Sequence, residues 1–336
     1  MATEAIVDVP VARARRVRLS VVTPVFNEEA NLDRYAAEVT ATLFAAPGIE
    51  ARVLFVDDGS RDSSWLKLQA LCAASPRFSA LRLSRNYGAH LALAAGFDAV
   101  GEDADAVAVL ACDLQDPVAT LLDFVAAWRQ GADIAWGQRR TRADEGWKRK
   151  ASSLLENTLR RHAMPRHSRF TTGSFLLMDA RVLACLKQFR EHSRVTFALV
   201  AWTGFNQAVV PYDRQARLAG KSGWKFGQML NTAYDVLIGF SPLPAKLMTG
   251  IGVGMCALSL AMTAYLLLVW ALSRVQPGWT GVMVTILLCF GVLFMMVGVM
   301  AEYLHRIFIE AKNRPLYFVA DGAGADAPAG ARREHG

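Results

Sequence analysis

The amino-acid sequence predicts an α/β domain with a doubly wound, mainly parallel sheet, followed by an amphipathic interface helix and a two-helix transmembrane hairpin. Three observations support this prediction. Short apolar segments rich in β-branched residues alternate with segments of helical periodicity in the N-terminal part of the chain. Polar residues follow every expected strand. Two long apolar stretches, 248–272 and 281–301, each reach the ~20 residues needed to cross a hydrocarbon core.

The elements are expected in a regular strand–helix order. Strands are expected at Val17–Thr23, Arg52–Val56, Leu81–Leu83, Ala106–Ala111 and Asp133–Trp136. Helices are expected at Glu28–Ala46, from Asp62, at Ala89–Val100 and at Pro117–Trp128. A further helix is expected at Ser152–His162, with further strands at Thr172–Met178 and Gln207–Val210. Because such alternation buries a parallel sheet on both faces, ligands should bind beyond the carboxyl ends of the strands.

The chain divides into five expected parts. These are a disordered lead (1–16), the α/β domain (17–224), an interface helix with a linker (225–245), two transmembrane helices (246–303) and a cytoplasmic tail (304–336). Within the third part, Phe226–Phe240 carries apolar residues at helical spacing, which suits a helix lying in the membrane interface. Packing of this helix into a protein core remains an open alternative.

Composition excludes several classes of protein. The chain is 53% hydrophobic and 20% charged, and residues 247–301 contain Arg274 as their one charged residue, which favours membrane segments over a large core. The net charge of +7 does not form one long basic run, so no nucleic-acid partner is expected. The five cysteines include no CxxC pair, which argues against a disulfide framework or a zinc site.

Basic residues predict the orientation in the membrane. Lys225 and Lys246 precede the first span, and Arg306, Lys312 and Arg314 follow the second, whereas the turn between the spans carries Arg274 alone. The positive-inside bias therefore predicts an inner (plasma) membrane protein with the α/β domain and both termini in the cytoplasm.

The strongest motif pair is Thr23–Glu28 after the first strand and Val56–Ser60 after the second. Adjacent carboxylates at a strand end suit hydrogen bonding to a base edge and a ribose diol, and Gly59 permits a tight turn with close backbone approach. An isolated Asp-Asp-Gly is also an ordinary turn. The combination of both motifs at strand ends favours a binding site.

These motifs resemble the signature of family 2 glycosyltransferases, whose fold is the GT-A nucleotide-sugar domain. The resemblance covers residues 17–318, continuing through Arg85–Gly88, Asp113–Pro117 and Arg217–Trp224. With the two membrane spans, the chain is similar to the polyprenyl-phosphate branch, which includes dolichyl-phosphate mannose synthase and bacterial undecaprenyl-phosphate sugar transferases. Tetramers occur in this branch, so the resemblance leaves a homo-oligomer open.

The resemblance implies roles for the matching residues. The nucleotide sugar would be bound by Pro24, Asn27, Glu28, Asp57, Asp58, Gly59, Ser60 and Asn86. A Mg²⁺ or Mn²⁺ ion would be held by Asp113 and Gln115, whose hard oxygen atoms suit these metals. The catalytic residues would be Asp113, Arg139, Arg149 and Arg217. The acceptor phosphate would meet Arg139, Ser153, Arg217 and Ser222. For the arginines, a basic surface beside anionic lipid is the alternative.

Two positions depart from the family pattern. Ala111 stands where relatives often carry the first metal-site aspartate, so the site either binds metal more weakly or recruits Asp116. Ser174 stands where many relatives carry a carboxylate. A lipid monophosphate acceptor tolerates that loss, because its oxygen is already ionised, with a second pKa of ~6, and needs positioning more than a general base.

The predicted function is an inverting transfer of one sugar from a nucleotide diphosphate sugar to a polyprenyl phosphate at the cytoplasmic membrane face, as in cell envelope glycan biosynthesis. A UDP-sugar is favoured as the donor by analogy with bacterial relatives. Two alternatives remain open. One is transfer to a glycolipid hydroxyl, and the other is a catalytically silent membrane subunit of a glycan-export complex.

Overall fold

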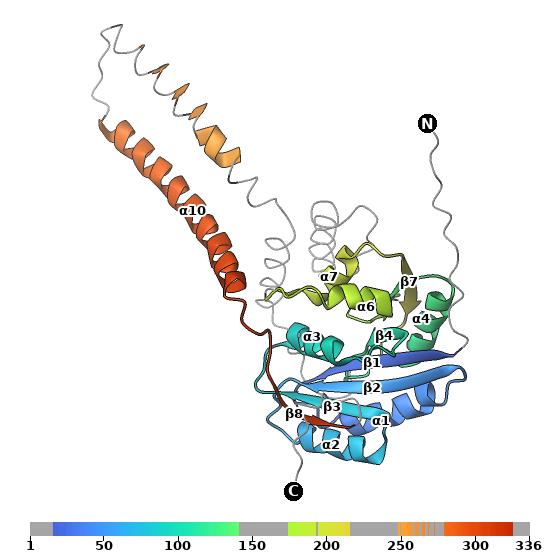
Figure 1. Ribbon diagram of the computed structural model, residues 1–336. Helices are drawn as coiled ribbons and strands as arrows, with labels where there is room; N and C mark the ends of the chain where they lie inside the picture. The colour runs from blue at the N-terminus through green and yellow to red at the C-terminus, as the bar shows by residue number, and fades with distance from the viewer. Residues whose placement is uncertain are drawn as a thin grey trace, which may run out of the picture. The chain divides into compact units, whose positions relative to one another are not determined.

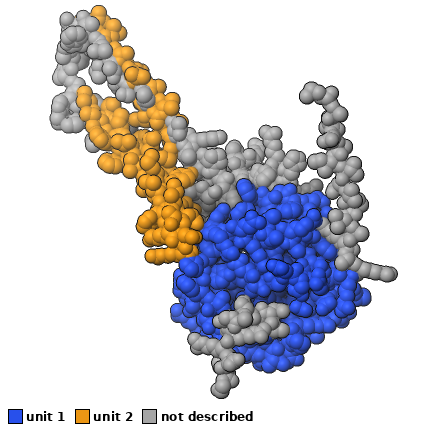
Figure 2. Space-filling view, in the orientation of Figure 1, with its two compact units in different colours: residues 1–229, 315–336 blue, residues 230–314 orange. Residues whose placement is uncertain are grey.

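The computed structural model describes residues 16–140, 174–192, 194–215 and 279–324, with some helical residues between 248 and 272 (Figure 1). The chain forms two compact units, residues 1–229 with 315–336 and residues 230–314 (Figure 2). The N-terminal lead before residue 16, the predicted helix 152–162 and the predicted interface helix 225–245 lie outside the described residues. They stay predictions.

The first unit contains an eight-stranded sheet in the order β7-β5-β6-β4-β1-β2-β3-β8. Its strands are β1 (Val17–Val25), β2 (Ile49–Asp57), β3 (Phe78–Leu83), β4 (Ala106–Val109), β5 (Ile134–Arg139), β6 (Leu176–Asp179), β7 (Gln207–Tyr212) and β8 (Val319–Ala323). Strands β4, β1, β2 and β3 run parallel, as do β5 and β7. The predicted α/β class and mainly parallel sheet are confirmed. Antiparallel β6 and β8 make the sheet mixed.

Helices cover the sheet in two groups. A core cluster joins the sheet to α1 (Leu32–Val39), α2 (Ser64–Ala74) and α4 (Thr120–Arg129). A short π-helical turn, Thr40–Phe44, continues α1. The other group is α3 (Ala89–Ala99), α6 (Ala180–Leu186) and α7 (Thr196–Trp202). Helix α7 contacts both α3 and α6, and α3 packs on β1 and β2. The sheet is therefore buried on both faces, as the continuous apolar strands predicted.

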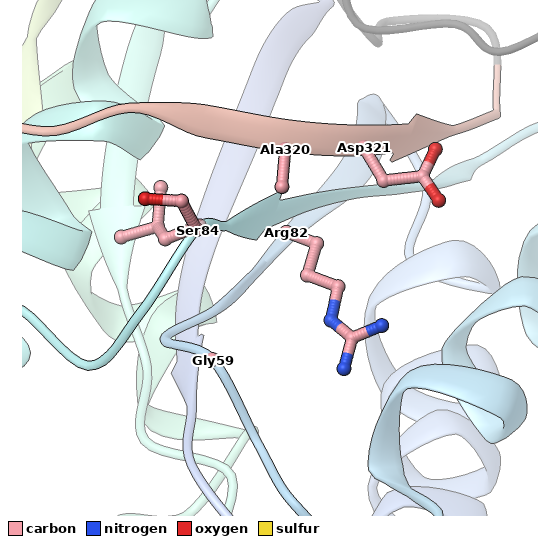
Figure 3. A pocket seen from close by; sticks show the side chains of 6 residues that line it. Gly59, Arg82, Ser84, Ala320 and Asp321 are labelled. Atoms are coloured by element: carbon pink, nitrogen blue, oxygen red, sulfur yellow. The ribbon is translucent and has the colours of Figure 1, made fainter.

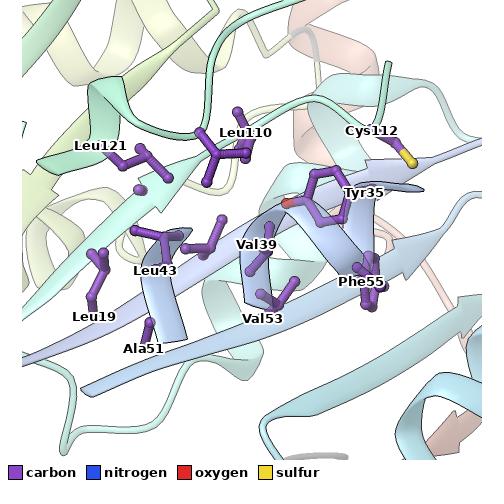
Figure 4. Close-up of a cluster of buried hydrophobic side chains, with 14 of the residues drawn as sticks. Leu19, Tyr35, Val39, Leu43, Ala51, Val53, Phe55, Leu110, Cys112 and Leu121 are labelled. Carbon is purple, nitrogen blue, oxygen red and sulfur yellow. The ribbon is translucent and has the colours of Figure 1, made fainter. Parts of the chain in front are cut away.

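Alternation and helical spacing account for the core. In β1 the odd-numbered residues Leu19 and Val21 belong to the cluster, and Tyr35 and Val39 of α1 meet them from the facing helix (Figure 4). The sequence predicted this helix from its 3.6-residue period. The helix begins at Leu32, four residues later than predicted, because the preceding residues form a hydrogen-bonded loop beside β2.

Strand β8 comes from the segment that the sequence assigned to the C-terminal tail. It pairs antiparallel with β3, and the Ser84 amide donates to the Phe318 carbonyl at 2.9 Å. The Tyr317 hydroxyl donates to Asp98 Oδ2 at 2.8 Å, and the Leu316 side chain is buried. This short strand of small and polar residues has no apolar alternation, so sequence periodicity gave no signal for it. Strand β8 forms because its backbone pairs with the hydrogen-bonding edge of β3.

Loss of β8 is expected to destabilise the domain. A chain ending after Arg314 would leave the β3 edge unpaired and uncover the site of Leu316, lowering the unfolding free energy by about 2–3 kcal/mol and favouring aggregation. Thermal unfolding should shift downward by roughly 5–10 °C. A chain ending after Gly324 keeps β8 and is the matched control. An unchanged melting temperature in the shorter chain would contradict this prediction.

The second unit contains α10 (Trp279–Ala311), a helix of 33 residues. Among the described residues, Cys289–Ala311 is one helical segment long and apolar enough to cross a membrane. The predicted span covers residues 281–301, and the helix continues beyond it to Ala311, where Glu302 and Arg306 form an i,i+4 ion pair at 2.9 Å. The first predicted span, 248–272, is only partly described, and its described residues up to 268 are helical. The two-helix hairpin therefore stays a prediction.

Candidate functional site

The loops after β1 and β2 are joined by hydrogen bonds at one edge of the sheet. The Asn27 amide donates to Ser60 Oγ at 2.9 Å, and the Arg61 amide donates to Asn27 Oδ1 at 2.9 Å. The Glu28 amide donates to Ser64 Oγ at 2.9 Å. Asn27 adopts a positive φ of 55°, a conformation that asparagine tolerates better than most residues. The two predicted motifs are thus a single folded unit, in which Pro24 belongs to the end of β1.

Asp57 and Asp58 are turned inward. Asp57 is fully buried; its Oδ1 accepts from the Ser60 amide at 3.0 Å and its Oδ2 lies 3.3 Å from Arg82 Nε. Asp58 accepts from the amides of Tyr87 and Gly88 at 2.7 and 2.8 Å. Burial raises the pKa of both carboxyl groups, and these hydrogen bonds oppose that rise. Both carboxylates therefore organise the loops around the site.

Gly59 is required by both conformation and space. Its φ is +70°, and a Cβ atom there would lie 2.7 Å from the backbone carbonyl carbon of Arg85 and 2.9 Å from the Asn86 nitrogen. Glycine therefore lets the β2 turn touch the loop after β3. Through this contact the predicted residue Asn86, which is exposed, is held beside the Asp57–Ser60 turn.

A second loop follows β4 and carries the predicted metal residues. The Gln115 amide donates to Asp113 Oδ1 at 3.2 Å, and Leu114 between them has a positive φ of 51°. The Gln115 side-chain oxygen accepts from the Arg214 guanidinium. Asp113 and Gln115 are both partly exposed. The loop is therefore tightly folded with both predicted side chains at its surface.

Asp116 is held from β7. It is 4% exposed, and its Oδ1 accepts from the Tyr212 hydroxyl at 2.5 Å. Burial raises the pKa of Asp116, while Tyr212 and the nearby arginines Arg139 and Arg214 oppose the rise. The idea that Asp116 replaces the carboxylate missing at Ala111 gains no support, because Asp116 is buried and bonded to Tyr212.

Arg139 lies beside this loop. It is the last residue of β5, in register with Tyr212 of β7, and its Nε lies 3.4 Å from the Tyr212 hydroxyl. The structure thus brings one predicted arginine next to the Asp113–Asp116 segment. Arg149, Ser153, Arg217 and Ser222 lie outside the described residues. Their predicted roles remain predictions.

Sequence reasoning missed Tyr212 and Arg214. The predicted strand stopped at Val210, directly before Pro211, which cannot donate a ladder hydrogen bond. In the structure β7 is an edge strand, where proline is tolerated, and it continues to Tyr212. The rule that strand ends carry the site would have found both residues if the strand had been extended.

The departures Ala111 and Ser174 lie at the same edge. Val109 of β4 pairs with Leu176 of the antiparallel β6, so Ala111 follows one strand end where Ser174 precedes the other. Both missing carboxylates are therefore missing from one place. In the described part of the chain, no three His, Cys, Asp or Glu side chains are grouped to hold a metal by themselves.

The donor set still fits a shared metal. Mg²⁺ is commonly bound through one or two carboxylates with substrate phosphates and water completing the shell. Asp113 supplies one carboxylate, and Gln115 supplies an amide oxygen if its bond to Arg214 is exchanged. The residues present therefore suit a metal held jointly with a diphosphate.

A pocket of about 250 Å³ adjoins the β2 turn (Figure 3). It is lined by Gly59, Arg82, Leu83, Ser84, Ala320 and Asp321. Strand β8 supplies one wall, and the motif glycine Gly59 belongs to the other. The C-terminal strand therefore lies next to the candidate site.

Tyr212→Phe tests the support of the Asp113 loop. Burial raises the pKa of Tyr212 to about 12, so the phenol stays protonated and donates to Asp116 at neutral pH. Removing the hydroxyl should cost about 1–3 kcal/mol of unfolding free energy at pH 8, where Asp116 would be buried and ionised. In the variant the pKa of Asp116 should be raised further, because its hydrogen-bond donor is gone. The loss of stability should therefore be smaller at pH 5, where the buried carboxyl group can take up a proton.

Chemical denaturation at both pH values measures this effect. Tyr87→Phe is the control, because its hydroxyl bonds Ser84 at an exposed position, and it should change stability by less than about 0.5 kcal/mol. An equal cost at pH 5 and pH 8 would contradict the role given to Asp116.

Comparison with known proteins points to one family. The model of glycosyl transferase family 2 matches residues 20–187. A glycosyltransferase of Synechocystis sp. is 35% identical over 306 residues, covering 91% of this chain and 95% of its own. The bactoprenol glucosyl transferase of Shigella phage SfII is 30% identical over 305 residues, covering 90% of this chain and 97% of its own.

Among solved structures, the mannosyltransferase PcManGT of Pyrobaculum calidifontis, in complex with GDP-Man and Mn²⁺, aligns with a TM-score of 0.47 at 15% identity. The alignment covers 84% of this chain and 87% of that chain.

Proposed function

Because the chain belongs to glycosyl transferase family 2 and is a glycosyltransferase, we propose that it moves one sugar from a nucleotide diphosphate sugar to a polyprenyl phosphate. The choice of acceptor rests on the match, over 90% of the chain, to relatives named bactoprenol glucosyl transferase, since bactoprenol is a polyprenyl lipid. An apolar helix long enough to span a bilayer supports a lipid acceptor.

The donor would bind at the loops after β1, β2 and β4. Asn27, Gly59 and Asn86 lie beside one another there, and Asp57 and Asp58 fix the loops from inside. Asp113 and Gln115 would hold Mg²⁺ or Mn²⁺, which when bound neutralises charge on the leaving diphosphate. A UDP-sugar is the donor we favour.

The acceptor phosphate would attack the anomeric carbon from the face opposite the leaving group, which inverts the configuration. A C–O bond to the lipid phosphate forms as the C–O bond to the nucleoside diphosphate breaks. The phosphate oxygen is already ionised near neutral pH, so Arg139 would position it without a general base. The carboxylate lacking at Ser174 supports this choice over a glycolipid hydroxyl, which needs its proton removed.

The β3–β8 pairing supports two membrane crossings. A strand that joins the sheet must lie on the same side of the membrane as β3, so the chain between residues 215 and 319 crosses an even number of times or not at all. If α10 is one crossing, the apolar stretch 248–272 is the natural candidate for the other. The basic residues flanking the two stretches support a cytoplasmic domain at the inner membrane.

The test is transfer by the purified full-length chain in detergent. Undecaprenyl phosphate and Mg²⁺ or Mn²⁺ are supplied with radiolabelled UDP-glucose, UDP-N-acetylglucosamine or GDP-mannose in separate reactions, and lipid-linked sugar is resolved by thin-layer chromatography. Product should form with one donor and disappear with a chelator. Undecaprenol without the phosphate is the control for the nucleophile.

The outcomes separate the alternatives. Product with undecaprenol but none with the phosphate would indicate a hydroxyl acceptor. No transfer and no metal-dependent nucleotide binding would reject the proposed reaction in favour of a silent subunit. Nucleotide binding without transfer would reject it in favour of a nucleotide-binding regulator.

A further inference from the structure

The side chain of Arg82 connects strand β3 to the turn after β2 at the candidate donor site. Arg82 of β3 is in register with Asp57 of β2, and its Nε lies 3.3 Å from Asp57 Oδ2. Its Nη2 also donates to the Ser60 carbonyl at 3.3 Å. We propose that Arg82 is a positioning residue of the donor site, which bridges Asp57 to Ser60 and thereby fixes the turn around Gly59. The proposal rests on the proposed donor site.

The bridge extends across two loops. Asp57 accepts from the Ser60 amide, and the Ser60 hydroxyl accepts from the Asn27 amide of the β1 loop. Arg82 also lies over the Trp65 ring of α2, with its guanidinium carbon 5.6 Å from the ring centroid. A planar, multiply donating guanidinium suits this geometry, because it can meet a carboxylate, a carbonyl and a ring face together. Movement of Arg82 would therefore displace both loops.

The charge of Arg82 offsets part of the cost of burying the Asp57 carboxylate. Asp57 has no exposed surface, so burial favours its neutral form and raises its pKa. Two hydrogen bonds from Ser60 and the charge of Arg82 oppose this rise, whereas the nearby carboxylate of Asp62 adds to it. The neighbouring Asp58 is bound by the amides of Tyr87 and Gly88. Without Arg82, Asp57 would protonate at a higher pH and its hold on the Ser60 amide would weaken.

The pocket beside β8 gives experimental access to this bridge. Arg82 lines it together with Ser84 and Asp321, and Figure 3 shows the Arg82 side chain extending away from β3. The volume of about 250 Å³ exceeds that of a guanidinium ion. A truncated Arg82 side chain would therefore leave a cavity that a free guanidinium ion can enter from solvent.

The experiment measures nucleotide binding by the full-length protein in detergent. Isothermal titration with UDP and with GDP, each with Mg²⁺, identifies the nucleotide that the wild type binds. With that nucleotide, Arg82→Ala should raise Kd by about tenfold or more, Arg82→Lys should raise it less, and guanidinium chloride at low concentration should partly restore Arg82→Ala. As the pH is lowered, Arg82→Ala should lose its affinity for the nucleotide at a higher pH than the wild type does, because Asp57 protonates earlier.

Arg52→Ala is the matched control. Arg52 lies on the adjacent strand β2, 3.5 Å from Asp103, and both side chains are exposed. The Kd of Arg52→Ala for the nucleotide should therefore stay within about twofold of the wild-type value. If Arg82→Ala binds the nucleotide as tightly as the wild type, the inference about Arg82 is overturned, while the proposed function stands. If the wild type binds neither nucleotide, the proposed function fails and the inference fails with it.

A double-mutant cycle decides the question if Arg82→Ala does not fold. Arg82→Lys, Asp57→Asn and the double variant each keep a side chain of similar size. Because both residues act through one bridge, the double variant should bind little worse than Asp57→Asn. Additive losses in Kd would overturn the inference, since they would show that Arg82 acts independently of Asp57.

Discussion

Asp113→Ala should abolish metal-dependent nucleotide binding and lower kcat/KM by about 10³-fold or more. The loop after β4 presents one partly exposed carboxylate, at Asp113, because Asp116 is buried against Tyr212 and position 111 is alanine. A metal shared with the diphosphate would lose its one carboxylate ligand from this loop. Relatives with two aspartates in this loop would keep a second one, so the effect here should be unusually complete.

Isothermal titration with and without a chelator measures the binding, and sugar transfer measures the rate. Asp123→Ala is the matched control, since Asp123 is an exposed carboxylate on α4 ten residues away. It should leave both quantities unchanged. Metal-dependent binding that survives in Asp113→Ala would remove this residue from the proposed metal site.

Gly59→Ala should have the largest effect on stability of any small substitution at the site. The new Cβ would lie 2.7 Å from the Arg85 carbonyl carbon and 2.9 Å from the Asn86 nitrogen, both of them backbone atoms that cannot rotate away. The positive φ of +70° adds strain. Together these effects should lower the unfolding free energy by about 3 kcal/mol and separate the β2 turn from the β3 loop.

Gly131→Ala separates conformational strain from the steric overlap. Gly131 has a φ of +104°, but a Cβ there would meet nothing within 4 Å, so its cost should be about 1 kcal/mol. Chemical denaturation of both variants gives the comparison, and nucleotide titration should show weakened binding in Gly59→Ala alone. Equal costs in the two variants would show that contact with the β3 loop contributes nothing.

The fold was predictable wherever a local pattern sets the structure. Helical periodicity predicted α1, whose Tyr35 and Val39 are buried, and the apolar strands predicted a sheet covered on both sides. Strand β8 was not predictable, because its residues carry no pattern of their own and its stability comes from the free edge of β3. The length of α10 was not predictable from hydropathy, because the helix continues to Ala311 past the apolar stretch that predicts a membrane span.

The candidate site was predictable as a place more than as a set of contacts. Strand ends located Asn27, Gly59 and Asp113 at one edge, and the structure brings Asn27 and Gly59 into one unit. The inward orientation of Asp57 was not predictable, since a carboxylate at a strand end can face a ligand or the protein. Its partner Arg82 lies in register across the sheet, which sequence spacing does not reveal.

The two strands of the β3–β8 pair lie far apart in the chain, so they are synthesised at different times. At about 5–20 residues per second, a ribosome needs on the order of 10–50 s to make the roughly 240 residues between Leu83 and Val319. Until β8 is made, the hydrogen-bonding edge of β3 has no partner from this part of the chain. Because β8 follows α10 in the chain, the sheet can be completed only after α10 has been synthesised, and, if α10 crosses a membrane as proposed, only when the chain after it has reached the side on which β3 lies.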